Sequence, residues 1–244
     1  MEYPVQAAKP RYDLGKWFEQ AWNVFKAHIW EFVLLNLVLA IPAVIIGGAA
    51  GVISFVSTSR NPHPPVFPLV PTGAQVGLTI AMAIFSAAVS VPLLVGMAAV
   101  ALSAVRTGAF DWNRLLTGFR KWPDSFVIGL IVGAFNSIPA LFPLLWIIFP
   151  IWLVVSMWGV FACYSLSETG MDAGKAIGRA IGLIRGNFWW AVLFAFVSAV
   201  VSGVGIIACC IGAFFTAAFY QALMAVAYND LSGSVATLTP DTED

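Results

Sequence analysis

Few residues of this 244-residue chain are of a type and spacing that could carry out chemistry. A general base needs a nucleophile or a substrate within reach, and the sequence around His28 and His63 supplies none. The HExxH, P-loop, GxSxG and paired-carboxylate patterns do not occur. Cys163, Cys209 and Cys210 lie in apolar stretches, without a second CxxC motif or a pair of histidines to complete a metal site. We therefore predict no enzymatic activity, no metal and no cofactor, with His28 as a metal or pigment ligand as the minor alternative.

Polar side chains inside long apolar stretches are the next candidates. Asn36, Asn136 and Gln221 are the ones we single out as intramembrane polar sites. One interpretation is hydrogen bonding between helices, which contributes about 0.6 kcal/mol each on average. The other is that they line a substrate path. Ionisable residues, which mark most intramembrane functional sites, are essentially lacking from the later apolar stretches.

Four glycines recur at every fourth position of one polar stretch: Gly174, Gly178, Gly182 and Gly186. On a helix this spacing forms a single bare stripe, and each glycine costs about 1 kcal/mol of helix propensity relative to alanine. Small residues at this spacing let helices approach backbone to backbone. The stripe therefore predicts close packing within the chain, which is our preferred interpretation, or a groove that docks a partner.

Basic residues cluster beside the apolar stretches and are candidate contacts of anionic lipid headgroups, each attracted by about 1 kcal/mol. The candidates are Lys16, Lys26, Arg120, Lys121, Lys175, Arg179 and Arg185. Several of the ten tryptophans fall at the same borders, as in the aromatic belts of membrane proteins. Lipid contact is expected, and selective lipid binding is a hypothesis.

The composition explains why such residues are so sparse. Sixty per cent of the chain is apolar and only 10% is charged, whereas a soluble domain carries about 25% charged residues. Charges this few could not cover a globular surface. We predict an all-α, polytopic integral membrane protein with six transmembrane helices, arranged as three hairpins that each follow a cytoplasmic amphipathic helix.

A repeat supports this organisation. Residues 13–30 align without a gap with residues 172–189, and a weaker middle copy opens at Asp111. The two outer copies are identical at Asp13/Asp172, Gly15/Gly174, Lys16/Lys175, Ala21/Ala180 and Trp30/Trp189. Tandem hairpins of one orientation can pack about an axis along the membrane normal, so we expect a pseudo-threefold arrangement.

The predicted boundaries follow from apolar length and from proline and glycine breaks. A flexible tail covers 1–12, a single membrane domain covers 13–231, and a disordered acidic tail covers 232–244. The amphipathic helices are expected at 13–29, 111–121 and 172–186, and the spans at 31–56, 76–105, 125–140, 145–166, 188–205 and 211–228. The 76–105 span exceeds one straight crossing, so we expect a bend near Pro92 or Gly96.

Basic residues also set the predicted orientation. Eleven of the twelve lysines and arginines fall in the N-terminal part and in the two connections at 106–122 and 168–187, leaving only Arg60 for the other side. The positive-inside rule then places both termini in the cytoplasm. We expect a multi-pass protein of the bacterial inner membrane.

Two stretches carry a resemblance to known bacterial proteins. They are VPLLVGMAAVALSAVRTGAFDWNRLLTGFRKW (Val91–Trp122) and DAGKAIGRAIGLIRGNFWWAVL (Asp172–Leu193), together with the later IIACCIGAFFTAAFYQALMAVAYNDL. The chain resembles the superfamily of six-span bacterial membrane proteins that includes the extended membrane domain of glycerophosphoryl diester phosphodiesterases and the YciC-like proteins. The resemblance implies the six-span fold and carries no catalytic residues.

The functional expectation is a non-enzymatic protein that binds lipid or a partner membrane protein as a structural or accessory component. Membrane lipids are the expected partners, then another membrane protein or a second copy of the chain; nucleic acid is not expected. A small transporter with a path between the hairpins is the alternative. An enzyme embedded in the membrane and acting on lipid is the third and weakest.

Overall fold

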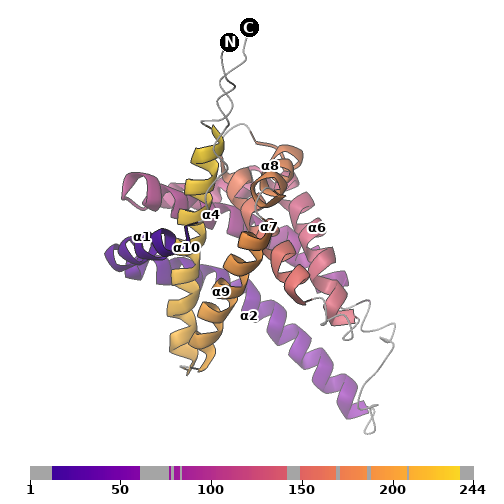
Figure 1. The fold of residues 1–244 in the computed structure, drawn as a ribbon. Coiled ribbons are helices and arrows are strands. Elements are labelled where there is room, and N and C mark those ends of the chain that lie inside the picture. Colours follow the sequence, from indigo (N-terminus) through magenta and orange to yellow (C-terminus); the bar gives the residue numbers. More distant parts are fainter. Residues whose placement is uncertain are drawn as a thin grey trace, which may run out of the picture.

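The computed structural model describes residues 13–60, 77, 80–82, 84–141, 149–168, 171–185, 188–207 and 209–236. Within these residues the chain is helical and contains no strand (Figure 1). The predicted all-α class is therefore confirmed, while the predicted tail at 1–12 lies outside the described residues.

The helices follow one another along the whole described chain. In order they are α1 (Leu14–Ala27), α2 (Ile29–Arg60), the π-helical turn η1 (Ser86–Ser90), α4 (Val91–Thr107), the 3-10 helix η2 (Trp112–Leu116), α5 (Thr117–Arg120), α6 (Trp122–Leu141), α7 (Phe149–Ser167), α8 (Ala173–Arg185), α9 (Phe188–Ile207) and α10 (Cys209–Ala236). Because α10 continues to Ala236, the prediction of a disordered tail from 232 is wrong for its first five residues.

An aspartate starts each of the three short segments that precede a long helix. The Oδ1 atom of Asp13 accepts a hydrogen bond from the backbone N–H of Lys16 (3.1 Å), and Oδ1 of Asp172 accepts one from that of Lys175 (2.8 Å). Oδ1 of Asp111 accepts from the backbone N–H of Asn113 (3.2 Å). Such caps satisfy donors that the first helical turn leaves unpaired.

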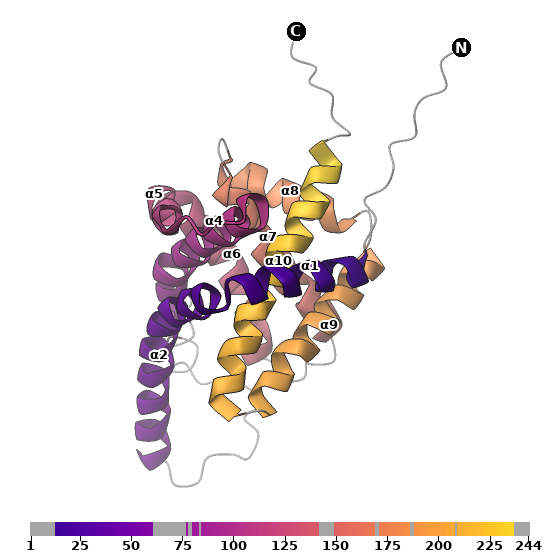
Figure 2. The same ribbon diagram turned by 90° about the vertical axis from the view of Figure 1, so that its left-hand side faces the viewer.

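Two of these segments meet the following helix at nearly a right angle. The bend is 91° between α1 and the first part of α2, and 98° between α8 and the first part of α9. Figure 2 shows α1 lying across the bundle before the chain turns into α2. We call these bends the first elbow (α1–α2) and the third elbow (α8–α9).

The burial of side chains follows the repeat in register. Trp17, Ala21 and Phe25 are buried on α1, and the aligned positions of α8 are buried as well. The register continues into the long helices, where Phe32, Leu35 and Asn36 align with the buried residues Ala191, Phe194 and Ala195. The two copies thus share a fold as well as a sequence pattern.

The middle copy departs from the prediction of an amphipathic helix at 111–121. The chain forms η2 and the single turn α5 there instead. A Cβ added to Gly96 would lie 1.8 Å from the carbonyl oxygen of Leu115, and one added to Gly118 would lie 1.9 Å from that of Pro92. The segment is therefore pressed backbone to backbone against α4.

A bend is predicted near Pro92 or Gly96; before Pro92 the chain forms the π-helical turn η1, within a helix that continues from Ile80 to Thr107. The backbone N–H of Val91 donates to the carbonyl oxygen of Ser86, a wider turn than in an α-helix, and α4 begins directly after it. A proline lacks the N–H group that a regular helix uses, and a single π turn is another recognised local departure from regular helix geometry.

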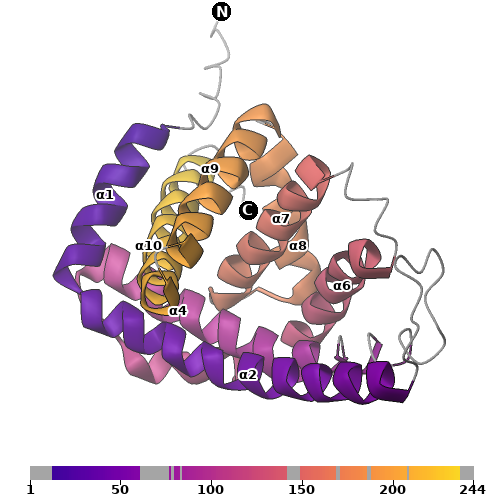
Figure 3. The same ribbon diagram turned by 90° about the horizontal axis from the view of Figure 1, so that it is seen from below.

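The helices contact one another in a repeating cycle. The second helix of each pair packs on the first helix of the next pair, giving the contacts α4–α6, α7–α9 and α10–α2. Each short segment packs on the second helix of the preceding pair: η2 and α5 on α4, α8 on α7, and α1 on α10. The inner helices α4, α7 and α10 contact one another (Figure 3). This is the arrangement that the pseudo-threefold pattern predicts.

At least one helix is long and apolar enough to cross a membrane. Among the described residues, Ile80–Thr107 meets this criterion alone, and the two elbow pairs raise the number to three if each bent pair is one span. We use the name collar for α1, η2–α5 and α8, which lie at the same end of the bundle as the C-terminal part of α10 (Figures 1 and 2).

Candidate functional site

The three inner helices meet in a cluster of charged and polar side chains at the ends of α4 and α7. Arg106 of α4 donates from Nη2 to Oε1 of Glu168 (2.8 Å) and from Nε to Oδ1 of Asn229 (2.8 Å). Arg179 of α8 donates from Nη1 to Oε2 of Glu168 (2.6 Å). We call these four residues the axial cluster. The carboxylate of Glu168, one residue after α7, joins α4 and α8, and Asn229 adds α10 through its bond with Arg106.

Aromatic and hydroxyl groups lie beneath the axial cluster. The guanidinium of Arg179 lies 6.0 Å from the ring centre of Tyr228, within the range of a cation–π contact. The hydroxyl of Tyr228 donates to Oγ of Ser165 (3.2 Å), and its ring stacks on Tyr164 at 5.4 Å. The cluster therefore sits on a packed polar layer.

Lys121 caps the C-terminus of α7. Its Nζ atom donates to the backbone carbonyl oxygens of Leu166 (2.8 Å), Glu168 (2.6 Å) and Met171 (3.2 Å). Carbonyls at a helix C-terminus lack helical partners, and a cation there is attracted to the negative end of the helix dipole. Burial lowers the pKa of Lys121, while the carboxylates of Asp124 and Glu168 act in the opposite direction.

A further carboxylate fastens α1 to α10. Oδ1 of Asp230 accepts a hydrogen bond from Nζ of Lys16 (3.1 Å), and Oδ2 accepts one from Nε1 of Trp17 (2.8 Å). Trp17 is fully buried, and its ring meets Phe194 edge to face at 5.3 Å. This contact closes the ring between the first and last copies.

The axial cluster is an ion-pair network that links helices to one another. Its carboxylate is shared by two guanidinium groups, and 17% of the side-chain surface of Glu168 is exposed against 42% for Arg106. Charge-assisted hydrogen bonds of this kind are short and strong. Among the described residues, no group of three His, Cys, Asp or Glu side chains is placed to hold a metal ion.

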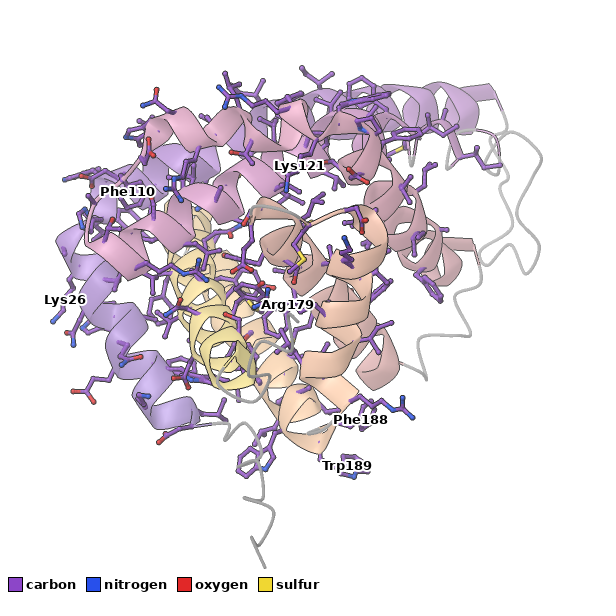
Figure 4. The ribbon with its side chains drawn as sticks, turned by 90° about the horizontal axis from the view of Figure 1, so that it is seen from above. Lys26, Phe110, Lys121, Arg179, Phe188 and Trp189 are labelled. Atoms are coloured by element: carbon purple, nitrogen blue, oxygen red, sulfur yellow. The ribbon has the colours of Figure 1, made fainter. Side chains whose placement is uncertain are left out.

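The two elbows carry exposed aromatic and basic side chains at aligned positions. Trp30 and Trp189 are 72% and 80% exposed, the highest values among the large hydrophobic residues described. Lys26 and Arg185, in the last turns of α1 and α8, are both exposed. Figure 4 shows Lys26, Phe188 and Trp189 at the outer edge of the molecule.

The structure divides the seven predicted lipid-contact cations. Lys121 and Arg179 make contacts inside the protein, nearer the middle of Figure 4, which corrects their assignment to the lipid surface. Lys16 is half-exposed but paired with Asp230. The remaining four are exposed: Lys26, Arg120, Lys175 and Arg185.

The predicted glycine stripe faces outward. Gly174, Gly178 and Gly182 are exposed, and no described neighbouring element lies within 4 Å of a Cβ added to Gly178 or Gly182. The described part of the chain therefore supplies no packing partner at Gly178 and Gly182, as the preferred interpretation, close packing within the chain, would require. Gly186 lies outside the described residues.

The predicted intramembrane polar residues are placed separately. Nδ2 of Asn36 donates to the carbonyl oxygen of Phe32 in its own helix (3.0 Å). Gln221 is buried and accepts a hydrogen bond from the hydroxyl of Tyr164 at its backbone oxygen (3.1 Å). Asn136 lies on α6, and its side chain is outside the described residues. In the described part of the chain, Asn36 and Gln221 bond to different partners and not to each other.

Sequence reasoning missed Glu168 and treated Arg106 only as a charge that sets orientation. A pattern in the sequence could have found both, because Arg106-Thr-Gly and Glu168-Thr-Gly follow the second and fourth apolar stretches at equivalent places. Opposite charges at equivalent positions of two repeats are well placed to pair across an axis.

No family model, no curated protein and no solved structure matches this chain. What the protein does must therefore be inferred from its own geometry.

Proposed function

We propose that the chain is a non-enzymatic protein of the bacterial inner membrane that binds membrane lipid and serves as a structural or accessory component. It crosses the membrane six times as three hairpins, with both termini in the cytoplasm. The expected lipid-binding region is the collar, and the bundle anchors it.

The observation that carries this proposal is the pair of elbows. Each turns an amphipathic helix through about a right angle into an apolar helix and exposes a tryptophan at the turn, Trp30 or Trp189. An amphipathic helix lies in the plane of the headgroups, and tryptophan is enriched at that depth. Because both elbows have this geometry, α1 and α8 are proposed to lie at the same depth in the headgroup region of the membrane.

Charge supports the orientation. The collar and its flanking residues hold most of the basic residues of the chain, and Arg60 lies at the opposite end of α2. A collar on the cytoplasmic side satisfies the positive-inside rule. Because Asn36 and Gln221 form hydrogen bonds within the protein, they give the transporter alternative no added support.

Topology is tested first, in the full chain. We expect green fluorescent protein fused to the C-terminus to fluoresce, and alkaline phosphatase inserted between residues 61 and 75 to be active. An inactive phosphatase, or extraction of the protein by alkaline carbonate, would contradict the membrane topology.

Lipid binding has its own readout, namely the phospholipid retained by the purified protein in native mass spectrometry. We expect the double variant Trp30→Ala/Trp189→Ala to retain less phospholipid than the wild type. The matched control is Trp158→Phe, which alters a tryptophan of α7 whose indole N–H has no described hydrogen-bond partner. Equal retention in the two variants would contradict the proposal.

A further inference from the structure

The first and third elbows have the same shape but opposite charge. Residues 13–31 hold two basic residues against three acidic ones, whereas the aligned residues 172–190 hold three basic residues against one acidic residue. The bends differ by only a few degrees, 91° against 98°. The two elbows therefore differ in the charge of their side chains and not in backbone geometry. A variant at one elbow can be compared with the same change at the aligned position of the other.

Two acidic residues of the first copy have no acidic counterpart in the third. Glu19, exposed on α1, aligns with the exposed Gly178, and Glu31, in the first turn of α2, aligns with Trp190. The first elbow also places Glu31 close to a ring nitrogen of His28, with an Oε1–Nδ1 distance of 3.7 Å. The first elbow thus carries its own anion.

Arg185 is the cation that the third elbow leaves uncompensated. It is exposed, and no described carboxylate lies within 4.0 Å of its guanidinium. The other two basic residues of this copy are engaged, Arg179 with Glu168 (2.6 Å) and Lys175 with Asp172 (3.7 Å). The aligned Lys26 lies over the ring of Trp22 at 5.7 Å.

Exposed apolar and aromatic side chains precede and follow Arg185 in the sequence. Ile181 is 46% exposed on the same face of α8, and the first turn of α9 adds three exposed aromatic residues. These are Phe188, Trp189 and Trp190, at 44%, 80% and 48%. Figure 4 shows Phe188 and Trp189 projecting from the edge of the bundle. Nothing within the described chain covers this face.

We propose that the third elbow is a docking surface for anionic phospholipid, in which Arg185 binds the lipid phosphate. The inference rests on the proposed function and specifies its ligand. The aromatic residues enter the boundary between headgroups and acyl chains, which suits their amphipathic rings. Glycine at 178 and tryptophan at 190 keep carboxylates away from the phosphate. The first elbow, with Glu19 and Glu31, binds lipid without this charge preference.

Charge complementarity favours lipid over a protein partner. A cation close to an anionic bilayer surface gains from a field that the membrane supplies everywhere around the collar. A guanidinium offers several N–H donors in a planar fork that matches phosphate oxygens. The bare face at Gly178 and Gly182 adds no side chain that would specify a protein surface.

The test is competition between phosphatidylglycerol and phosphatidylcholine, supplied in equal amounts to the purified full chain and counted by native mass spectrometry. The wild type should retain phosphatidylglycerol preferentially. Arg185→Gln should lower that preference about fivefold, the effect of one interfacial cation. Lys26→Gln is the aligned control and should leave most of the preference in place.

A second variant tests the anion argument directly. Trp190→Glu imports the carboxylate of the first elbow and should lower the preference at least as much as Arg185→Gln. Circular dichroism confirms that each variant is folded. An unchanged preference in Arg185→Gln, or an equal loss in Lys26→Gln, would overturn the inference while leaving lipid binding intact. Retention of no phospholipid by the wild type would overturn both this inference and the proposed function.

Discussion

Arg106 and Glu168 join the ends of α4 and α7 through an ion pair whose Nη2–Oε1 distance is 2.8 Å. The second oxygen of the same carboxylate accepts from Arg179 at 2.6 Å. One carboxylate thus links the end of α7 both to α8, which follows it in the chain, and to α4, 62 residues earlier. Each of the three inner helices reaches this cluster, because Asn229 of α10 accepts from Arg106.

Replacing Glu168 by glutamine should weaken the packing of the inner helices α4, α7 and α10 against one another. The change removes the negative charge that two guanidinium groups share, and loss of one partner of a partly buried ionic cluster is costly. We expect the free energy of unfolding in detergent to fall by about 1–3 kcal/mol. Denaturant unfolding followed by circular dichroism measures this directly.

The matched control is Glu19→Gln on α1. Glu19 is exposed and makes no described ion pair, so its change should stay within about 0.5 kcal/mol. If Glu168→Gln were as stable as this control, the axial cluster would not contribute to the stability of the helix bundle.

Lys121→Met should loosen the junction between α7 and α8. Three backbone carbonyls, those of Leu166, Glu168 and Met171, would lose their donor. Unsatisfied carbonyls cost about 1–3 kcal/mol, and thermal unfolding should reveal the loss. Arg120→Met changes the neighbouring exposed cation and should be nearly neutral. Equal stability of the two variants would contradict this role of Lys121.

Glycine substitutions should separate positions that pack from positions that do not. Gly96→Ala and Gly118→Ala place a Cβ within 2 Å of a backbone oxygen, so we expect severe loss of folded protein on size-exclusion chromatography. Gly178→Ala and Gly182→Ala meet no described neighbour and should stabilise α8 by up to about 1 kcal/mol each. Destabilisation by the second pair would show that something covers the stripe.

Much of the fold could be predicted because the repeated positions are the residues that determine where helices start, which face is buried and where the chain turns. Asp13 and Asp172 start their helices, Ala21 and Ala180 lie in the buried face, and Trp30 and Trp189 mark the exposed turn. A capping oxygen, a small buried side chain and an interfacial ring act locally. Local rules therefore suffice for the starts of α1 and α8 and for the bends that follow them.

Long-range contacts escaped sequence reasoning. Spacing alone cannot say which glycines meet another backbone. The regular stripe on α8 predicts close packing, whereas the close backbone contacts occur at the isolated Gly96 and Gly118. The same limit applies to charge. Arg179 has the sequence surroundings of a lipid-facing cation, but Glu168, eleven residues before it, draws it into the protein.

Asp230 should control the attachment of α1. It accepts from Lys16 and from the buried Trp17, and the exposed ion pair with Lys16 contributes less than about 1 kcal/mol. The hydrogen bond from Trp17 should therefore matter more. Asp230→Asn keeps an acceptor for the indole and should be mild, whereas Asp230→Ala removes both contacts.

Amide hydrogen exchange of the full chain in detergent distinguishes these effects. In Asp230→Ala we expect faster exchange across α1 and unchanged exchange across α8, which packs on α7 and makes no contact with Asp230 among the described bonds. The structural equivalence of α1 and α8 makes α8 the internal control. Uniformly faster exchange in both helices would indicate general unfolding, and unchanged exchange in α1 would show that its apolar face alone holds it to α10.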